Sequence, residues 1–231
     1  MVKKCYDRIM KRKIELITDQ VYHIFNRSIA EYKIFNNGEE FYRMMDLLKY
    51  YQIRNEIKFS DFIQLKQVEK NGFDKFFDII SKDKEKTVQI IGYCLMPTHF
   101  HLIIKQLAEK GISSYIGSIL NSYTHYFNAR HKRKGPLWES KFKNVLVSKD
   151  EQLIHLTRYL HLNPTTALLV DKPEQWLFSS YNEYLSLSDS TSTLCQYSDI
   201  LDIKPSEYKK IVNDRIAYQR DLAKIKKLLL D

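Results

Sequence analysis

The sequence has little of what marks a secreted or membrane-spanning protein. Its three cysteines, Cys5, Cys94 and Cys195, are far apart and odd in number, so they suit a reducing compartment and form neither a disulfide framework nor a zinc-binding pattern. No apolar run approaches the roughly 20 residues that cross a bilayer, and the basic N-terminus lacks the apolar segment of a signal peptide. No internal repeat is visible. These absences predict a cytoplasmic protein that is not embedded in a membrane.

What the chain does have is positive charge and aromatic side chains. Its 231 residues are 44% hydrophobic, which is enough for one sizeable core and a small appendage. The formal net charge of +9 favours a polyanionic partner, with nucleic acid ahead of an anionic membrane surface. The sixteen tyrosines and twelve phenylalanines supply core and strand residues, and some of them could stack on nucleic-acid bases.

Hydrophobic patterning predicts an α+β fold. Strands are expected at 21–27, at 88–95, from His99 to Ile104 and at 142–147, and helices from Glu39, from about 113 to 131 and from about 150 to 162. The order βαββαβ followed by a further helix is that of a ferredoxin-like antiparallel sheet with helices packed on it. Ser148 is a candidate cap of the last helix. Asn163-Pro164 should end that helix, because the residue before proline disfavours the α region.

Two segments lie outside this pattern. Residues 55–87 are charged, carry clustered phenylalanines, and are expected to form a helical insertion between the first helix and the second strand. Residues 186–193 are rich in Ser, Thr and Asp, and a helix with one apolar stripe is expected from Pro205. The sequence therefore predicts a main domain over 1–185 and a linker with a helical extension over 186–231.

Two histidines follow the turn between the second and third strands. His99 and His101 are two residues apart in a strand, so their side chains share one face of the sheet, and Phe100 points the other way into a core. A neutral imidazole nitrogen is a common ligand of divalent metals, so the pair is a candidate two-point metal site. Strand histidines are more often surface or hydrogen-bonded core residues, and the pattern alone does not separate these alternatives.

A tyrosine and an asparagine lie one turn apart on the predicted helix after the last strand. Tyr159 and Asn163 are four residues apart and therefore share a face. A tyrosine hydroxyl can attack phosphorus, but its ordinary pKa of about 10 requires help from a polarised phosphate or a nearby base. The Asn163 carbonyl is a candidate third metal ligand beside the two histidines. The alternatives are that Tyr159 only packs and that Asn163 only marks a helix end.

A cationic cluster precedes the last strand. Between residues 130 and 143, six cations stand against the single acid Glu139: Arg130, Lys132, Arg133, Lys134, Lys141 and Lys143. Such a cluster can neutralise DNA phosphates and gives salt-dependent binding, although the same residues also suit a solvated helix end. Trp138 within the cluster is a further candidate DNA contact. His23, Asn26 and Arg27 in the first strand are weaker candidates.

Several stretches together resemble the single-tyrosine HUH transposases of the IS200 type, and especially the REP-associated tyrosine transposases. The resemblance covers about residues 20–185. It is carried by Tyr22-His23-Ile24-Phe25-Asn26-Arg27, Met96 to His101, Gly135-Pro136-Leu137-Trp138-Glu139-Ser140-Lys141-Phe142, Arg158-Tyr159-Leu160-His161-Leu162-Asn163-Pro164 and Trp176-Leu177-Phe178-Ser179-Ser180-Tyr181. Residues 55–87 are longer and more charged than the family pattern, and residues 186–231 match it only weakly.

The resemblance implies a nuclease and strand transferase that acts on single-stranded DNA next to hairpins or inverted repeats. His99 and His101 match the metal-binding pair of the family. Tyr159 matches the nucleophile and Asn163 the position of the third ligand, with Mg²⁺ or Mn²⁺ as the expected metal. The implied reaction is attack of Tyr159 on a phosphodiester, which leaves a 5′-phosphotyrosine and a free 3′-OH. Some relatives are dimers that exchange tyrosine helices and others act as monomers, so a monomer or a homodimer is expected, and Tyr159 serves its own chain or its partner.

Two alternatives use the same fold. One is a non-catalytic module that stacks nucleic-acid bases on an exposed sheet, and the presence of both histidines and Tyr159 argues against it. The other is an HUH nuclease of plasmid replication or transfer. The lack of a helicase region and the set of IS200-like stretches disfavour it.

Overall fold

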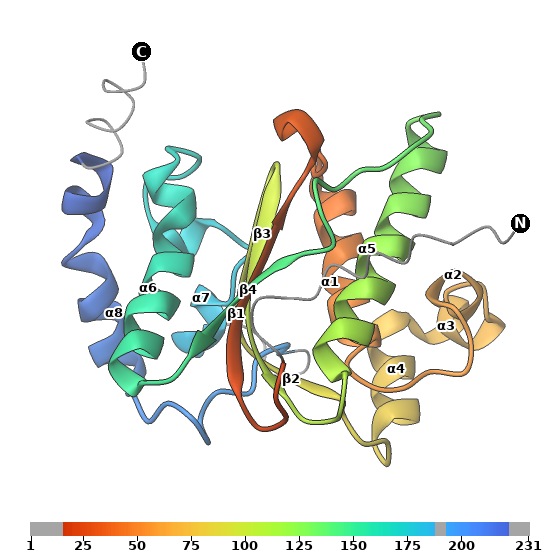
Figure 1. Ribbon diagram of the computed structural model, residues 1–231, viewed down its shortest axis with the longest axis horizontal. Helices are drawn as coiled ribbons and strands as arrows, with labels where there is room; N and C mark the ends of the chain where they lie inside the picture. Colours follow the sequence, from red (N-terminus) through yellow and green to blue (C-terminus); the bar gives the residue numbers. More distant parts are fainter. Residues whose placement is uncertain (1–15, 188–192, 222–231) are drawn as a thin grey trace, which may run out of the picture.

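A four-stranded antiparallel sheet in the order β2-β3-β1-β4 forms the centre of the molecule (Figure 1). The structure, a computed structural model, describes residues 16–187 and 193–221. The strands are β1 (Val21–Arg27), β2 (Val88–Met96), β3 (His99–Gln106) and β4 (Lys143–Val147). This strand order, with the helices between the strands, confirms the predicted ferredoxin-like fold of the α+β class.

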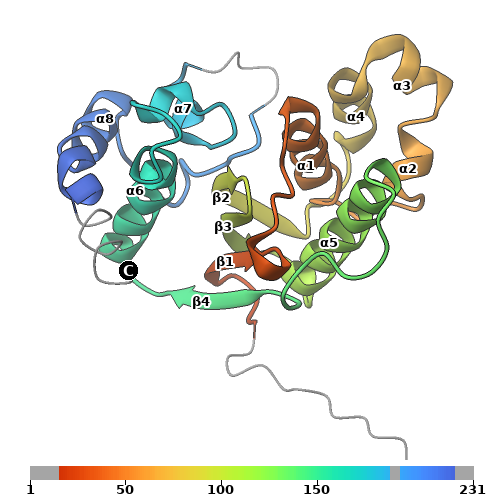
Figure 2. The ribbon, with the colours of Figure 1, turned by 90° about the horizontal axis from the view of Figure 1, so that it is seen from above.

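Helices cover both faces of the sheet (Figure 2). One face carries α1 (Gly38–Tyr50) and α5 (Gly111–Arg130), beside which lie the short helices α2 (Phe59–Phe62), α3 (Lys66–Asn71) and α4 (Phe73–Ser81). The other face carries α6 (Asp150–Thr166), α7 (Tyr181–Tyr184) and α8 (Pro205–Asn213). The 3-10 helices η1 (Ile29–Glu31) and η2 (Pro173–Gln175) lie in connections. We call these two sides the α1/α5 face and the α6 face.

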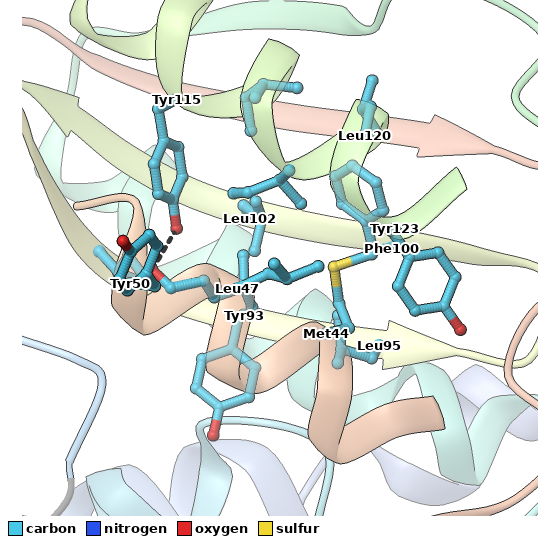
Figure 3. Close-up of a cluster of buried hydrophobic side chains, with 14 of the residues drawn as sticks. Met44, Leu47, Tyr50, Tyr93, Leu95, Phe100, Leu102, Tyr115, Leu120 and Tyr123 are labelled. Atoms are coloured by element: carbon cyan, nitrogen blue, oxygen red, sulfur yellow. Dashed lines mark hydrogen bonds between the residues drawn. The ribbon is translucent and has the colours of Figure 1, made fainter. Parts of the chain in front are cut away.

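The larger core lies on the α1/α5 face (Figure 3). The hydrophobic side chains that the two central strands send to this face are all buried: Tyr22, Ile24, Phe100, Leu102 and Ile104. The Tyr115 hydroxyl of α5 donates to the Leu48 carbonyl of α1 at 2.9 Å, so this buried polar group is satisfied between the two covering helices. Phe100 is 2% exposed, which confirms its predicted direction.

A second core lies on the α6 face. It includes Ile91 and Cys94 of β2, Ile103 of β3, Leu160 of α6 and Tyr208 of α8. Because α8 contributes to the same core as α6, the C-terminal helix packs against the helix that carries the tyrosine. Pro205 is the first residue of α8, where the missing amide donor costs nothing.

The segment between α1 and β2 extends the core of the α1/α5 face. Two of its short helices, α2 and α4, pack on Tyr50, whose ring lies 4.9 Å from the Phe62 ring and 5.6 Å from the Phe77 ring, between centroids. The expected helical character of this segment is therefore observed. Its status as an insertion, and the boundary placed at residue 186, stay predictions. Residues 188–192 and 222–231, which belong to the predicted linker and extension, lie outside the described residues.

The described cysteines, Cys94 and Cys195, are buried free thiols, and Cys5 lies outside the described residues. No helix within 16–187 or 193–221 has both the length and the apolar character needed to cross a membrane.

The start of α6 differs from the prediction. The helix begins at Asp150 after Lys149, and no side chain caps it. The Ser148 backbone N instead donates to the Gln152 Oε1 atom at 3.1 Å. The Gln152 side chain thus folds back over the first turn of α6 and accepts a hydrogen bond from the backbone N–H of Ser148, just before the helix.

The end of α6 also differs, and this difference matters for the site. The predicted stop at Asn163-Pro164 is wrong, because the helix continues through Pro164 to Thr166. A proline in a helix interior costs roughly 3 kcal/mol. Pro164 is buried together with Leu162 and Thr165, and burial of this segment offsets that cost. Asn163 therefore has helical geometry, one turn after Tyr159.

Candidate active site

Strand alternation places His99 and His101 on the α6 face of the sheet. Both follow the Pro97-Thr98 turn of the β2–β3 hairpin. Since β3 lies between β2 and β1, His101 is opposite Cys94 on one side and Phe25 on the other. The imidazole centroids of the histidine pair are 5.2 Å apart, with the ring planes at 90°. A strand that is hydrogen-bonded on both sides holds this pair rigidly.

Each of these imidazoles has one nitrogen in a hydrogen bond. His99 Nδ1 lies 3.0 Å from Thr98 Oγ1, and His101 Nδ1 lies 2.9 Å from His23 Nε2. Among the described residues, neither the Nε2 atom of His99 nor that of His101 has a hydrogen-bond partner. Because the Nδ1 atoms are engaged, both rings offer Nε2 as the nitrogen for a metal ion.

Burial keeps these imidazoles neutral. It lowers the pKa of His101 to about 2 and the pKa of His23 to about 4. The pKa of His99 is also lowered, first by burial and then by the positive charge of Arg27. Neutral imidazole is the form that binds metal, so neither ring of the pair must lose a proton near neutral pH.

Tyr159 reaches the same place from α6. Its ring stands edge-on to that of His101, with the centroids 5.6 Å apart and the planes at 83°. The side chain is 45% exposed, so it is not part of the hydrophobic interior. Burial raises the pKa of Tyr159, and the neighbouring Asn163 side chain lowers it in part. The structure thus brings Tyr159, Asn163 and the histidine pair to one side of the sheet.

The Asn163 amide has an unused polar atom. As drawn, its Nδ2 atom is buried and has no hydrogen-bond partner. The oxygen and nitrogen of an amide exchange places on a half-turn of the group, which would leave the oxygen free beside Tyr159. Two imidazole nitrogens and one amide oxygen fit a divalent cation. No set of three or more His, Cys, Asp or Glu side chains in the described residues could hold a metal ion, so a site here would require Asn163 or water.

Comparison with known proteins identifies the family. Residues 50–163 match the family model of IS200-like transposases. Over these residues the chain is similar to the IS200-like transposases. A REP-associated tyrosine transposase bound to a REP hairpin has a similar solved structure, with a TM-score of 0.53 and 12% sequence identity over 84% of this chain and 94% of that chain. At that identity the likeness shows the fold alone. No curated protein matches the sequence. The match supports a transposase function, which implies an enzyme that cleaves DNA.

Two of the arginines that the sequence offered as DNA contacts of this transposase form ion pairs with acidic side chains. Arg130 pairs with Glu39. Arg27 lies 3.6 Å from Glu31 and 3.8 Å from Glu139, measured between side-chain nitrogen and oxygen atoms. These guanidinium groups would have to share or exchange their partners in order to bind phosphate.

The loop between α5 and β4 joins the sheet beside the histidine pair. The Glu139 backbone N donates to the Arg27 carbonyl at 3.1 Å, and Arg27 is opposite His99 in the β1–β3 register. Arg133 shapes this loop by donating to Asn128 Oδ1 at 2.9 Å and to the Pro136 carbonyl at 2.6 Å. Four lysines of the cluster are exposed and form no ion pair with any described residue: Lys132, Lys134, Lys141 and Lys143.

Trp138 is a core residue. It is 9% exposed, and its Nε1 donates to Thr124 Oγ1 at 3.1 Å. Its ring packs edge-on against Phe100, at 5.5 Å between centroids. The ring is therefore mostly covered by the core, and a direct DNA contact of Trp138 stays a prediction. Asn26 has a similar structural role, because its Nδ2 donates to the Ser140 and Lys141 carbonyls.

The segment after α6 fastens the tyrosine helix to the sheet. The Leu95 backbone N donates to the Phe178 carbonyl, and the Trp176 Nε1 donates to the Leu95 carbonyl, both at 2.9 Å. This pairing covers the outer edge of β2. His161 of α6 is buried, with Nε2 at 2.7 Å from Ser180 Oγ and Nδ1 at 2.6 Å from the Tyr208 hydroxyl. The His161 side chain thus links α6 to this segment and to α8.

The partner of His101 was not found from the sequence. His23 was considered only as a weak DNA contact, whereas the structure places it against a predicted metal ligand. Alternation in β1 puts His23 on the same face as Phe25 and Arg27. That signal is visible in the sequence, but the neighbour of β1 and the register of the pairing are not.

Proposed function

We propose that this transposase cleaves single-stranded DNA with Tyr159 as the nucleophile. The Tyr159 oxygen forms a bond to phosphorus while the bond from phosphorus to the 3′ oxygen of the preceding nucleotide breaks. The phenolic proton passes to solvent and the departing oxygen takes up a proton, which leaves a 5′-phosphotyrosine and a free 3′-OH. The observation that carries the proposal is the edge-on contact of a half-exposed Tyr159 with His101 on the α6 face.

His99 and His101 are the proposed ligands of a divalent cation, Mg²⁺ or Mn²⁺, through their Nε2 atoms. The free polar atom of Asn163 supports this residue as the third ligand. When bound, the cation supplies a Lewis acid and a template for the phosphate oxygens. The residues of the chain fix the two imidazoles and hold the tyrosine hydroxyl beside them. The Asn163 side chain beside Tyr159 partly offsets the rise that burial causes in the pKa of its hydroxyl.

Single-stranded DNA next to a hairpin is the proposed substrate. The solved relative is bound to a REP hairpin. In this chain the α5–β4 loop is bonded through the Glu139 backbone to Arg27, which is opposite His99. The four exposed lysines of this loop and of the start of β4 would neutralise phosphates. Since Tyr159 contacts His101 of its own chain, we propose that the tyrosine acts in cis and that a monomer suffices.

The test is a covalent-adduct assay with Mn²⁺ and single-stranded oligonucleotides that carry inverted repeats from the DNA flanking the gene. Wild-type protein should give a protein–DNA adduct, and Tyr159→Phe should abolish it. Tyr42→Phe is the matched control, because Tyr42 is 53% exposed and lies on α1 across the sheet. An adduct that persists in Tyr159→Phe would identify a different nucleophile. Salt-dependent binding without any adduct would favour the non-catalytic alternative.

A further inference from the structure

The hydrogen bond between His23 and His101 joins two strands of the sheet. His23 comes from β1 and His101 from β3, two strands that pair in antiparallel fashion. The Nε2 atom of His23 and the Nδ1 atom of His101 are 2.9 Å apart, and the two ring planes differ by 22°. Phe25 packs against both rings, at 4.9 Å from His23 and 5.9 Å from His101 between centroids. The two imidazoles are therefore held against each other by backbone pairing and by an aromatic neighbour.

A hydrogen bond between two imidazoles orders their protons. One nitrogen must donate and the other must accept. His101 can offer Nε2 to a metal ion only if that nitrogen carries no proton, which requires the proton on Nδ1. The acceptor for this proton is His23 Nε2, and the proton of His23 then resides on its own Nδ1. The contact thus supplies an acceptor for the tautomer of His101 that metal binding needs, in which Nδ1 carries the proton.

We propose that His23 is a positioning residue that fixes the tautomer and the ring orientation of His101. This inference rests on the proposed metal site. It makes His23 neither a nucleophile nor a ligand. His23, His99 and His101 do not form a three-histidine site for a metal ion, and the His23 nitrogen that faces His101 is already in the hydrogen bond. Thr98 occupies the corresponding place beside His99.

Substitution of His23 by leucine and by glutamine separates positioning from packing. His23→Leu fills the space but removes the acceptor, whereas His23→Gln keeps an amide oxygen that can accept from His101 Nδ1. Mn²⁺ affinity is measured by calorimetry on the full chain without DNA. Loss of a partner of a metal ligand typically costs about 10–100-fold in affinity, so His23→Leu should bind Mn²⁺ more weakly by that factor. His23→Gln should stay within about threefold of wild type, because the acceptor is kept.

The control removes a histidine elsewhere. His125 is exposed on α5, on the opposite face of the sheet, and His125→Leu should keep wild-type Mn²⁺ affinity. Thermal unfolding of each variant shows whether a loss of affinity is accompanied by a loss of fold. Nitrogen NMR of the imidazoles gives a readout that needs no substitution, since wild-type His101 should carry its proton on Nδ1.

The outcomes separate this inference from the proposed function. Wild-type protein that fails to bind Mn²⁺ would overturn the metal site and the inference together. Wild-type binding with undiminished affinity in His23→Leu would overturn the inference alone, as would a proton on Nε2 of wild-type His101. Weak binding by His23→Leu with rescue by His23→Gln supports the role of His23.

Discussion

The two faces of the sheet use the same strands in opposite ways. On the α1/α5 face, β1 and β3 contribute buried hydrophobic side chains and the buried amides of Asn26 and Gln106, and these are covered by two long helices. On the α6 face, the same two strands contribute three histidines near the hairpin end, with a half-exposed tyrosine beside them. The comparison shows how one fold separates stability from chemistry, because successive residues of a strand point to opposite sides.

The difference between the faces also explains why the histidine pair is held rigidly while Tyr159 stays exposed. The histidine pair stands on a sheet whose reverse side is fully packed, so the strand that carries it has little freedom to move. The covering element on the α6 face is a single helix near the pair, which leaves Tyr159 accessible to a substrate. The proposed ligands and the proposed nucleophile therefore come from different elements.

The largest expected effect is a loss of adduct formation on substitution of a histidine on the α6 face. His99→Ala removes a proposed ligand whose metal is worth several kcal/mol in the transition state, which at about 1.4 kcal/mol per factor of ten means a loss of adduct formation of about 100-fold or more. Binding of hairpin DNA should stay close to wild type, because phosphate contacts of the lysines are kept. Rates of adduct formation and binding titrations measure the two quantities. Cleavage at the wild-type rate would dismiss the metal role of His99.

Substitution of the neighbouring residue, Phe100, should destabilise the core on the α1/α5 face. Phe100→Ala empties a fully packed position on the α1/α5 face and should lower the free energy of unfolding by about 3–5 kcal/mol. Denaturant titration measures this loss. His99→Ala, one residue away in the same strand, should change stability far less. The two variants together test whether the α1/α5 face provides stability and the α6 face the proposed chemistry. Equal destabilisation by both substitutions would contradict it.

His161, which is buried on the α6 face, should make the stability of the protein depend on pH. Burial lowers its pKa in the folded protein from 6.5 to about 3. The unfolded chain therefore binds a proton below about pH 6.5 that the folded chain does not. His161 thus contributes nothing to the pH dependence above that value and lowers stability as the pH falls from 6.5 toward 3, by about 1.4 kcal/mol per pH unit. Denaturant titrations at several pH values should show a shallower dependence for His161→Gln, and an unchanged slope would contradict the assignment.

The smallest effects should come from the exposed lysines of the α5–β4 loop. Lys134→Ala should weaken hairpin binding modestly and to a similar extent for different sequences. It should also reduce the slope of log affinity against log salt by about 1. Lys75→Ala, at an exposed position on α4, is the matched control and should leave the slope unchanged. If both variants behave alike, the DNA does not follow the α5–β4 loop.

Much of the fold could be predicted because its signals are local. The bounds of β1 follow from a run of β-branched and aromatic residues, and the hairpin follows from Met96-Pro97-Thr98 between two apolar runs. The direction of Phe100 follows from alternation alone. Trp138 shows the limit, because nothing in its neighbours distinguishes a tryptophan that binds bases from one that donates to Thr124 in the core.

The sequence by itself determined the strands, their faces and the family, since each depends on residues close together in the chain. Only the tertiary structure decided that α6 runs through Pro164 and that His23 meets His101. A proline in a helix is tolerated only when burial elsewhere outweighs the lost hydrogen bond, and a contact between strands 78 residues apart depends on their pairing register. Both are properties of the whole packed molecule, which no local pattern contains.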